Sequence, residues 1–194
     1  MLRLVVGLDT AKAQRYIAFL RAINVGGHTV KMERLRSSFA ALGFGAVETF
    51  IASGNVIFQA AATDVQALER QIEAHLRQAL GYDVTTFIRT LSEVAAIAAY
   101  QPFPSDELAA SGNTLYIAFL AAAPMAEVAT KLQSLRNPID DFHIHEREVY
   151  WLCRRALGES RFSGALLEKT LGMPATVRNV TTVKKLAAKY PPPA

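Results

Sequence analysis

Features typical of membrane-spanning and secreted proteins are scarce in this sequence of 194 residues. No apolar run approaches the ~20 residues that span a bilayer. Asp9 interrupts the apolar stretch at residues 4–8, and no small-residue cleavage site follows, which argues against a secretory signal. The single cysteine, Cys153, excludes an internal disulfide framework and fits a reducing compartment. We therefore expect a soluble, cytoplasmic protein that does not associate with membranes.

Sequence signatures of catalysis and metal binding are also missing. His143 and His145 share one face of a predicted strand and offer two metal ligands at most. The Walker A loop, the dinucleotide fingerprint and GxSxG do not occur. Cys153 ends an apolar strand, which favours a core position despite the adjacent Arg154 and Arg155. The sequence thus assigns no catalytic residue, no metal and no cofactor, and whether the protein is an enzyme stays open.

Charge is distributed unevenly over a chain of ordinary globular composition, with 51% hydrophobic and 20% charged residues. The net charge is +4, yet residues 147–194 alone hold nine lysines and arginines against three glutamates, a net charge of +6. The part before them is therefore slightly acidic. A basic C-terminal quarter indicates an anionic partner such as phosphate, a nucleotide, nucleic acid or an acidic protein surface. A solvated basic surface is the alternative interpretation.

An internal repeat organises the chain. The pentapeptide YIAFL occurs at residues 16–20 and again at 116–120. The same succession of patterns follows each copy: a helix, two short strand-like runs, a second helix and a last strand. In the first half these are predicted at 32–42, 47–52 and 55–59, 64–80, and 84–89. In the second half they are predicted at 124–135, 139–145 and 148–153, 161–171, and 175–178, before a closing helix at 181–190.

Each half therefore has the order β-α-β-β-α-β, which is the ferredoxin-like pattern. We predict an α+β protein with two ferredoxin-like lobes in tandem, built of mainly antiparallel sheets with helices packed on them. The predicted organisation is a flexible N-terminal extension (1–15), a first lobe (16–90), a helix and linker (91–113) and a second lobe with a C-terminal helix (114–194). The linker comprises a helix at 92–100 and a loop at 101–113 that is rich in Pro, Ser and Gly.

This topology predicts that two glycine-bearing loops of the first lobe are neighbours. The turn after the first strand holds Asn24, Gly26 and Gly27, and the bend between the second and third strands holds Ser53, Gly54 and Asn55. Both emerge at the same end of the sheet. Free backbone amides at the start of a helix favour an anion, and Lys31 in the first helical turn opposes the helix dipole unless an anion lies beside it.

Ordinary turn chemistry is the alternative interpretation of these loops. The second half helps to decide, because it has Ala121-Ala122-Ala123-Pro124 at the corresponding positions, with neither the glycine pair nor the lysine. If the fold alone required Gly-Gly, the sister lobe should require it too. This difference favours a binding site in the first lobe.

A third motif lies before the closing helix. Arg178 ends the last predicted strand and Asn179 follows it, and Arg178 can bind an anion through two hydrogen bonds. Thr181 or Thr182 is predicted as the N-cap of the helix. A capped amphipathic helix with solvated lysines is the alternative interpretation.

Three segments resemble the bacterial domain-of-unknown-function family 1697: YIAFLRAINVGG at 16–27, SGNVIF at 53–58 and ATVRNVTTV at 175–183. The chain departs from that family's pattern at Ala22, where glycine is usual, and at Val180 and Thr181, where a tryptophan-asparagine pair is usual. The resemblance implies an α+β fold but no activity. The positions that match the recurring motifs are Arg21, Asn24, Gly26, Gly27, Lys31, Ser53, Gly54, Asn55, Arg178 and Asn179.

The leading hypothesis is that these first-lobe loops bind a small anionic, phosphate-bearing ligand. An enzyme acting on a phosphorylated metabolite in the same cleft, and non-specific nucleic-acid binding by the basic C-terminal region, are the alternatives. The sequence does not indicate the oligomeric state.

Overall fold

Each half of the chain folds into a four-stranded antiparallel sheet, in the order that the sequence pattern predicts. The computed structural model describes residues 13–24, 27, 29–61 and 64–193. The first sheet consists of β1 (Gln14–Leu20), β2 (Gly45–Phe50), β3 (Asn55–Ala60) and β4 (Thr86–Thr90), and the second of β5 (Thr114–Phe119), β6 (Asp140–His145), β7 (Glu148–Cys153) and β8 (Thr176–Asn179). The strand orders are β2-β3-β1-β4 and β6-β7-β5-β8, which are equivalent.

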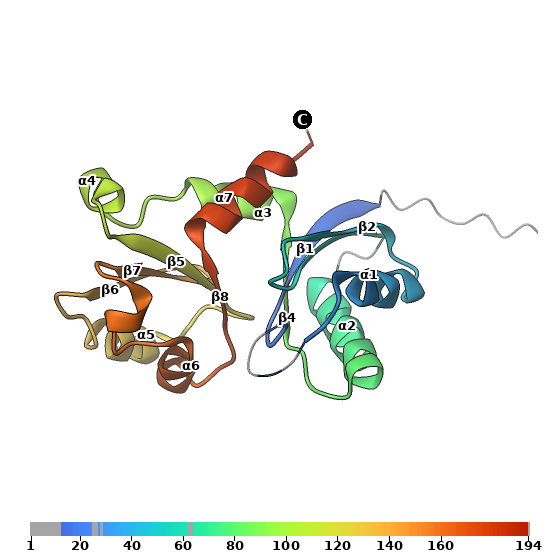
Figure 1. Ribbon diagram of the computed structural model, residues 1–194, viewed down its shortest axis with the longest axis horizontal. Coiled ribbons are helices and arrows are strands. Elements are labelled where there is room, and N and C mark those ends of the chain that lie inside the picture. The colour runs from blue at the N-terminus through green and yellow to red at the C-terminus, as the bar shows by residue number, and fades with distance from the viewer. Residues whose placement is uncertain (1–12, 25–26, 28, 62–63, 194) are drawn as a thin grey trace, which may run out of the picture.

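Two helices cover the outer face of each sheet (Figure 1). They are α1 (Met32–Ala41) and α2 (Val65–Leu80) on the first sheet, and α5 (Ala126–Gln133) and α6 (Gly164–Leu171) on the second. We call β1 to β4 with α1 and α2 the first lobe, and β5 to β8 with α5 and α6 the second lobe. The likeness of the two lobes confirms the predicted α+β fold with tandem ferredoxin-like lobes.

The inner faces of the two sheets turn toward each other and share a third core. Because successive residues of a strand point to opposite faces, Tyr16 and Ala18 pack beneath the first-lobe helices while Ile17 and Phe19 enter this shared core. Phe19 stacks on Phe119 at the centre, with ring centroids 3.8 Å apart and planes inclined by 11°. Burial on both faces explains why the repeated pentapeptide is apolar throughout.

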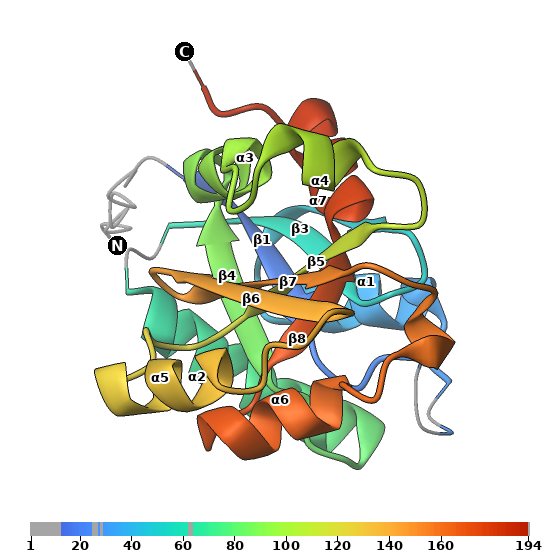
Figure 2. The same ribbon diagram turned by 90° about the vertical axis from the view of Figure 1, so that its left-hand side faces the viewer.

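Helices α3 (Leu91–Ala99) and α7 (Val180–Lys189) each follow the last strand of a lobe and pack on each other over the shared core (Figure 2). Thr90 and Glu93 form a capping box at the start of α3. Asn179 caps α7 by accepting a hydrogen bond from the Thr181 amide, so the prediction of Thr181 or Thr182 as its N-cap was wrong. The N-cap lies two residues before Thr181, because β8 passes directly into α7.

Local differences from the predicted elements are small. The first strand begins at Gln14 rather than at residue 16, because Gln14 still pairs with Ala60. The predicted loop at 101–113 contains a short helix, α4 (Ser105–Ala109), with Asp106 and Glu107 in its first turn. Most of the predicted N-terminal extension falls on residues 1–12, outside the described part. Among the residues described, no helix is both long and apolar enough to cross a membrane.

Candidate functional site

The two glycine-bearing loops are neighbours, as the topology predicts. The Leu20 amide donates to the Gly54 carbonyl at 2.8 Å, and Nδ2 of Asn24 donates to the Ala52 carbonyl at 2.8 Å. Gly26 lies outside the described residues. The turn after β1 and the bend between β2 and β3 are therefore fastened together at one end of the first sheet.

Two of the predicted site residues hold this junction in place. Oδ1 of Asn24 accepts from the Val30 amide at 2.7 Å, so both ends of its side-chain amide are engaged in the loop. Gly54 has a φ of 71°, and an added Cβ would come within 2.8 Å of Cβ of Ile23. Only glycine fits there without strain. These contacts give Asn24 and Gly54 a structural role at the junction of the two loops.

Gly27 and Lys31 lie on the outside of the loop. Gly27 is exposed with a φ of 87°, a conformation that favours glycine. Lys31 is exposed and is the residue before the first turn of α1, where its side chain makes no capping hydrogen bond. Neither residue borders the cavity that lies behind the junction.

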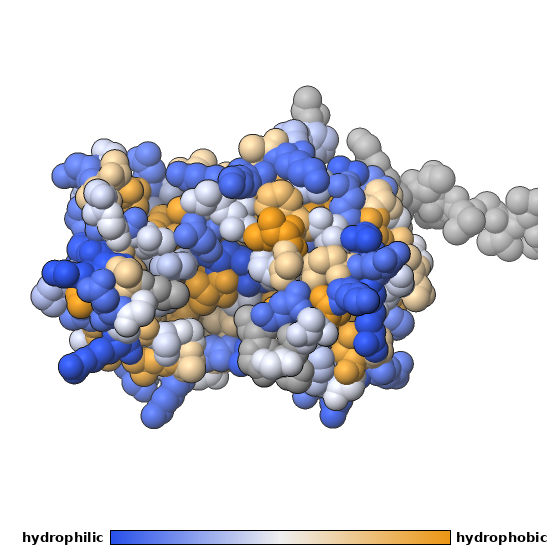
Figure 3. Space-filling view, viewed as in Figure 1, coloured by the Kyte–Doolittle hydropathy of each residue, from blue (hydrophilic) through white to orange (hydrophobic). Residues whose placement is uncertain are grey.

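That cavity, of about 400 Å³, lies between the two lobes. In the space-filling view an apolar area shows in the recess where the lobes meet, between more polar rims (Figure 3). Three of the predicted site residues, Arg21, Ser53 and Arg178, line the cavity. The other lining residues are Leu20, Ala22, Ile23, Gly164, Glu168, Ala175, Thr176 and Val177. We call it the interlobe cavity.

Arg178 is a buried cation that binds only uncharged acceptors. Its Nε donates to Oδ1 of Asn55 at 2.8 Å. Nη1 donates to Thr176 Oγ1 and to the Val177 carbonyl, and Nη2 to the carbonyls of Leu20 and Gly54. No carboxylate of the described chain forms an ion pair with it. Burial lowers the pKa of Arg178 to about 10, so the guanidinium is still charged at neutral pH.

Arg21 and Glu168 form an ion pair across the two lobes at the wall of the interlobe cavity. Nε and Nη2 of Arg21 donate to the two carboxylate oxygens at 2.6 and 2.9 Å. Oε1 of Glu168 also accepts from the Ala175 amide at 2.8 Å. Burial raises the pKa of Glu168, but these hydrogen bonds outweigh burial and hold the pKa below its ordinary value. Glu168 therefore neutralises Arg21 and leaves the charge of Arg178 uncompensated.

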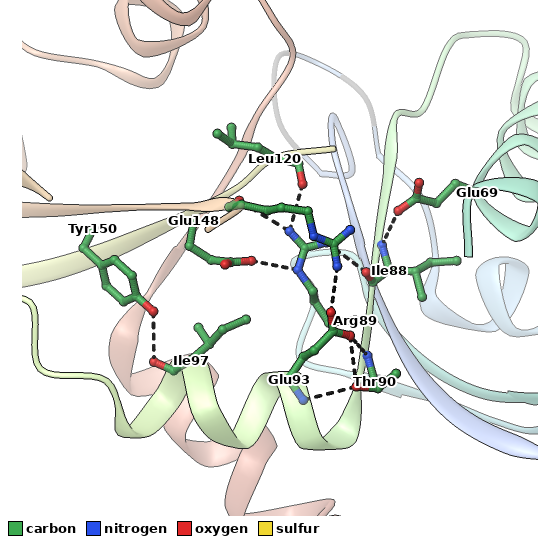
Figure 4. Close-up of polar contacts among 10 residues, drawn as sticks. Glu69, Ile88, Arg89, Thr90, Glu93, Ile97, Leu120, Glu148 and Tyr150 are labelled. Atoms are coloured by element: carbon green, nitrogen blue, oxygen red, sulfur yellow. Dashed lines mark hydrogen bonds and ion pairs between the residues drawn. The ribbon is translucent and has the colours of Figure 1, made fainter. Parts of the chain in front are cut away.

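Arg89 is the counterpart of Arg178 in the other lobe. Arg89 lies opposite Ile17 in the first sheet, as Arg178 lies opposite Ile117 in the second. Its Nη2 donates to the Leu120 carbonyl at 2.8 Å and its Nη1 donates to the Ile88 carbonyl at 2.8 Å (Figure 4). Each arginine thus crosses to the end of the other lobe's central strand. The reciprocal contacts are those of an approximate twofold relation between the lobes.

The two arginines differ in the partner of their Nε. Nε of Arg89 donates to Oε1 of Glu148 at 2.7 Å, and both side chains are almost fully buried. Glu148 is the first residue of β7, and its counterpart at the start of β3 is Asn55. A carboxylate therefore neutralises one arginine, whereas a neutral amide faces the other. Asn55 is fully buried behind Ser53, whose Oγ accepts from Asn55 Nδ2 at 2.9 Å.

Asn179 belongs to a different part of the molecule. It caps α7 and lines a cavity of about 590 Å³ between α3, α4 and α7, together with Lys184. The structure brings Arg21, Ser53, Gly54, Asn55 and Arg178 together and places Asn179 apart from them.

Ion pairs or burial involve five of the nine basic residues of the C-terminal quarter. Arg147 pairs with Glu93, and Arg154 pairs with Glu107. Arg155 and Lys189 also have acidic partners, and Arg178 is buried. The remaining basic side chains are Arg161, Lys169, Lys184 and Lys185.

Other residues of types that are common in catalytic and metal sites make structural contacts. Nε2 of His143 is 2.8 Å from the Tyr100 hydroxyl, and the ring of His145 stacks on the same tyrosine. Cys153 is buried, which raises the pKa of its thiol. Within the described ranges, no group of three or more His, Cys, Asp or Glu side chains is arranged to hold a metal ion.

Sequence reasoning missed Arg89, Glu148, Gly164 and Glu168. The Arg21–Glu168 pair joins residues 147 positions apart, so no local sequence pattern predicts it. The two buried arginines do leave a signal: Arg89-Thr90 and Arg178-Asn179 each place an arginine directly before the residue that ends the last strand of a lobe and caps the next helix. The signal is easily overlooked because the spacing between the two arginines differs from the spacing between the two YIAFL copies.

Comparisons with known proteins agree with this fold. A family model described as a protein of unknown function (DUF1697) matches residues 13–150. The conserved bacterial protein SP0830 from Streptococcus pneumoniae is similar in structure, with a TM-score of 0.72 and 21% identity over 92% of this chain and 98% of its own. No match was found among curated proteins. Since the family model covers more than half of the sequence, the chain belongs to the DUF1697 family.

Proposed function

We propose that the protein binds a small anionic ligand in the interlobe cavity, beside Arg178. The observation that carries the proposal is the uncompensated charge of Arg178, whose counterpart Arg89 is neutralised by Glu148. A buried charge without a counter-charge is unfavourable. An anion in the adjacent cavity supplies the missing charge, and its attraction is strong because the surroundings are poorly solvated.

The arginine acts on the ligand mainly through its charge, because its donors already bind five oxygen acceptors. Direct hydrogen bonds come from the cavity wall. Oγ of Ser53 accepts from Asn55, and its hydroxyl hydrogen remains to donate to a ligand. Arg21 is two-fifths exposed, so its guanidinium is available at the cavity edge.

The lining residues favour binding over catalysis. Glu168 is the one acidic residue among them, and its carboxylate is held ionised by Arg21 and the Ala175 amide. Ser53 has no histidine or carboxylate partner to activate it among the described residues. The pairing of the C-terminal basic residues gives no support to non-specific binding of nucleic acid.

The test compares how inorganic phosphate and propionate change the thermal unfolding midpoint at constant ionic strength. A ligand that binds only the folded state raises the midpoint. Asn55→Asp places a carboxylate on Arg178 and should abolish the response. Asn179→Asp is the matched control, because it makes the same change at a helix N-cap that lines a different cavity and retains the capping oxygen.

We expect at least one of the two anions to stabilise the wild-type protein and Asn179→Asp but not Asn55→Asp. If neither anion raises the midpoint of the wild-type protein, or if Asn55→Asp responds as strongly as the wild-type protein, the proposed function is wrong.

A further inference from the structure

Two acidic side chains of α2 hold the edge of β4 in the first lobe. Oε1 of Glu73 accepts from the Thr86 amide at 2.8 Å. Oε1 of Glu69 accepts from the Ile88 amide at 2.8 Å, a contact that is drawn in Figure 4. Glu69 is largely buried, which raises the pKa of its carboxyl, whereas the Ile88 amide and the nearby Arg89 favour its ionised form. The edge of this strand is thus closed by carboxylates from the chain itself.

The second lobe keeps one of these carboxylates and lacks the other. Glu168 corresponds to Glu73, because it accepts from the Ala175 amide, which occupies the position of Thr86. Four residues earlier, where α2 has Glu69, α6 has Gly164. An added Cβ at Gly164 would lie 3.9 Å from Cγ2 of Val177, an ordinary contact, so a side chain can begin at this position without a clash.

The amide of Val177 is left without the partner that its counterpart has. Val177 lies opposite Ala118, as Ile88 lies opposite Ala18, and β8 is the last strand of its sheet. The Val177 carbonyl accepts from Arg178, which shows that the peptide groups at this position point away from β5. No side chain of the described chain accepts from the Val177 amide, and Val177 and Gly164 both line the interlobe cavity.

We infer that the ligand of the interlobe cavity carries a carboxylate group, which takes the place of the Glu69 side chain and accepts a hydrogen bond from the Val177 amide. This inference rests on the proposed function and makes it more specific. The first lobe supplies the template: a carboxylate on a short methylene chain, an edge amide and a buried arginine. The second lobe retains the amide and the arginine, together with a cavity of about 400 Å³ that has room for the rest of the ligand.

The inference is tested by titrating the ¹⁵N-labelled protein with propionate, which has the three carbons of a glutamate side chain, and separately with inorganic phosphate. We expect propionate to move the Val177 amide resonance downfield, because an N–H that donates to a carboxylate is deshielded. Gly164→Glu should show the displaced resonance without ligand and should lower the affinity for propionate more than about tenfold, a change of roughly 1.4 kcal/mol. Gly164→Ala adds only a Cβ and should bind like the wild-type protein.

The outcomes separate this inference from the proposed function. If phosphate binds in an Asn55-dependent manner but propionate leaves the Val177 amide unmoved, the ligand is an anion of another class and the carboxylate inference is wrong. The same holds if Gly164→Glu folds and binds propionate unchanged. If neither anion binds the wild-type protein, both proposals fail. The titration of the wild-type protein decides the matter even where Gly164→Glu does not fold.

Discussion

The two buried arginines show one architecture with two different electrostatic environments. Arg89 and Arg178 occupy equivalent strand positions and bind equivalent carbonyls across the lobe junction. Around Arg89 the chain provides the carboxylates of Glu148 and Glu69, whereas the same positions around Arg178 are Asn55 and Gly164. The comparison indicates that the fold requires an arginine at this position to link the two lobes. The fold does not require an open and positively charged cavity beside that arginine.

This contrast also explains why the site lies where the lobes meet rather than on the loops alone. The loop residues Asn24 and Gly54 fasten the end of the first sheet. Once they are fastened, Ser53 and Arg21 face α6 and β8 of the second lobe. The cavity is therefore a product of both halves, and neither half would form it alone.

The largest effect should come from the part of the junction that is the same in both lobes. Phe19 and Phe119 are fully buried and stack on each other. Replacing either by alanine should lower the free energy of unfolding by about 3–5 kcal/mol, since each change removes a large side chain from the core. Urea denaturation of the two variants should give similar losses. A loss at one position only would mean that the lobes do not share this core equally.

The two arginines should differ in their contribution to stability. Arg89→Met leaves Glu148 buried and unpaired, which should lower the free energy of unfolding by about 3–5 kcal/mol. Arg178→Met leaves uncharged acceptors unsatisfied, at about 1–3 kcal/mol for each one that water does not reach, but it also removes an unfavourable buried charge, so the expected loss is smaller than that of Arg89→Met. Chemical denaturation of both variants checks the difference. Equal losses would contradict the view that only Arg89 is neutralised.

Much of this fold is predictable from the sequence, because the signals that define it are local. Short runs rich in apolar residues mark the strands, and Asp64 and Gly81 mark the ends of α2. The sequence predicted a loop at 101–113 and gave no indication of α4, because the composition of this segment is that of a loop and the helix has only five residues. The face-to-face packing of the sheets depends on contacts between distant segments, and no local pattern encodes it.

The site was predictable only in part, for the same reason. The topology places Ser53 near the turn after β1, and this prediction is confirmed by the contacts of Leu20 and Asn24. The burial of Arg178 and the pairing of Arg21 with Glu168 depend on how the second lobe docks on the first. The predicted roles of Gly27 and Lys31 in binding stay predictions, and the structure places both residues outside the interlobe cavity.

A second pair of equivalent contacts should titrate in different pH ranges. Tyr100 and Tyr190 end α3 and α7, and their hydroxyls bind the equivalent strand residues His143 and Glu48, each at 2.8 Å. Burial lowers the pKa of His143 below its ordinary 6.5. The hydrogen bond from Tyr190 lowers the pKa of Glu48 below its ordinary 4.5. In both cases the unfolded chain takes up the proton first, so acid destabilises the folded state.

We therefore expect stability to fall below about pH 6.5 through His143 and again below about pH 4.5 through Glu48. His143→Gln should remove the first decline and Glu48→Gln the second. Both are measured as the slope of the free energy of unfolding against pH. An unchanged slope between pH 6.5 and 5 in His143→Gln would show that another group titrates there.

The smallest effect concerns the turn after each central strand. Ala22 has a φ of 62°, in the left-handed region that is unfavourable for alanine, whereas Ala122 is not among the residues with positive φ. Ala22→Gly relieves strain of about 1 kcal/mol and should leave the protein as stable or slightly more stable. Ala122→Gly should destabilise it by up to about 1 kcal/mol, because glycine gains freedom in the unfolded chain. Urea denaturation of both variants distinguishes the two signs.

The most direct test of the contrast between the two arginines is anomalous diffraction from crystals of the unmodified protein soaked in sodium bromide. Bromide is a small monovalent anion, and its position can be identified from its anomalous scattering. We predict a bromide peak in the interlobe cavity next to Arg178 and none next to Arg89. Peaks of equal height at both arginines, or a peak at neither, would contradict the claim that, of these two buried arginines, it is Arg178 whose positive charge is left to neutralise.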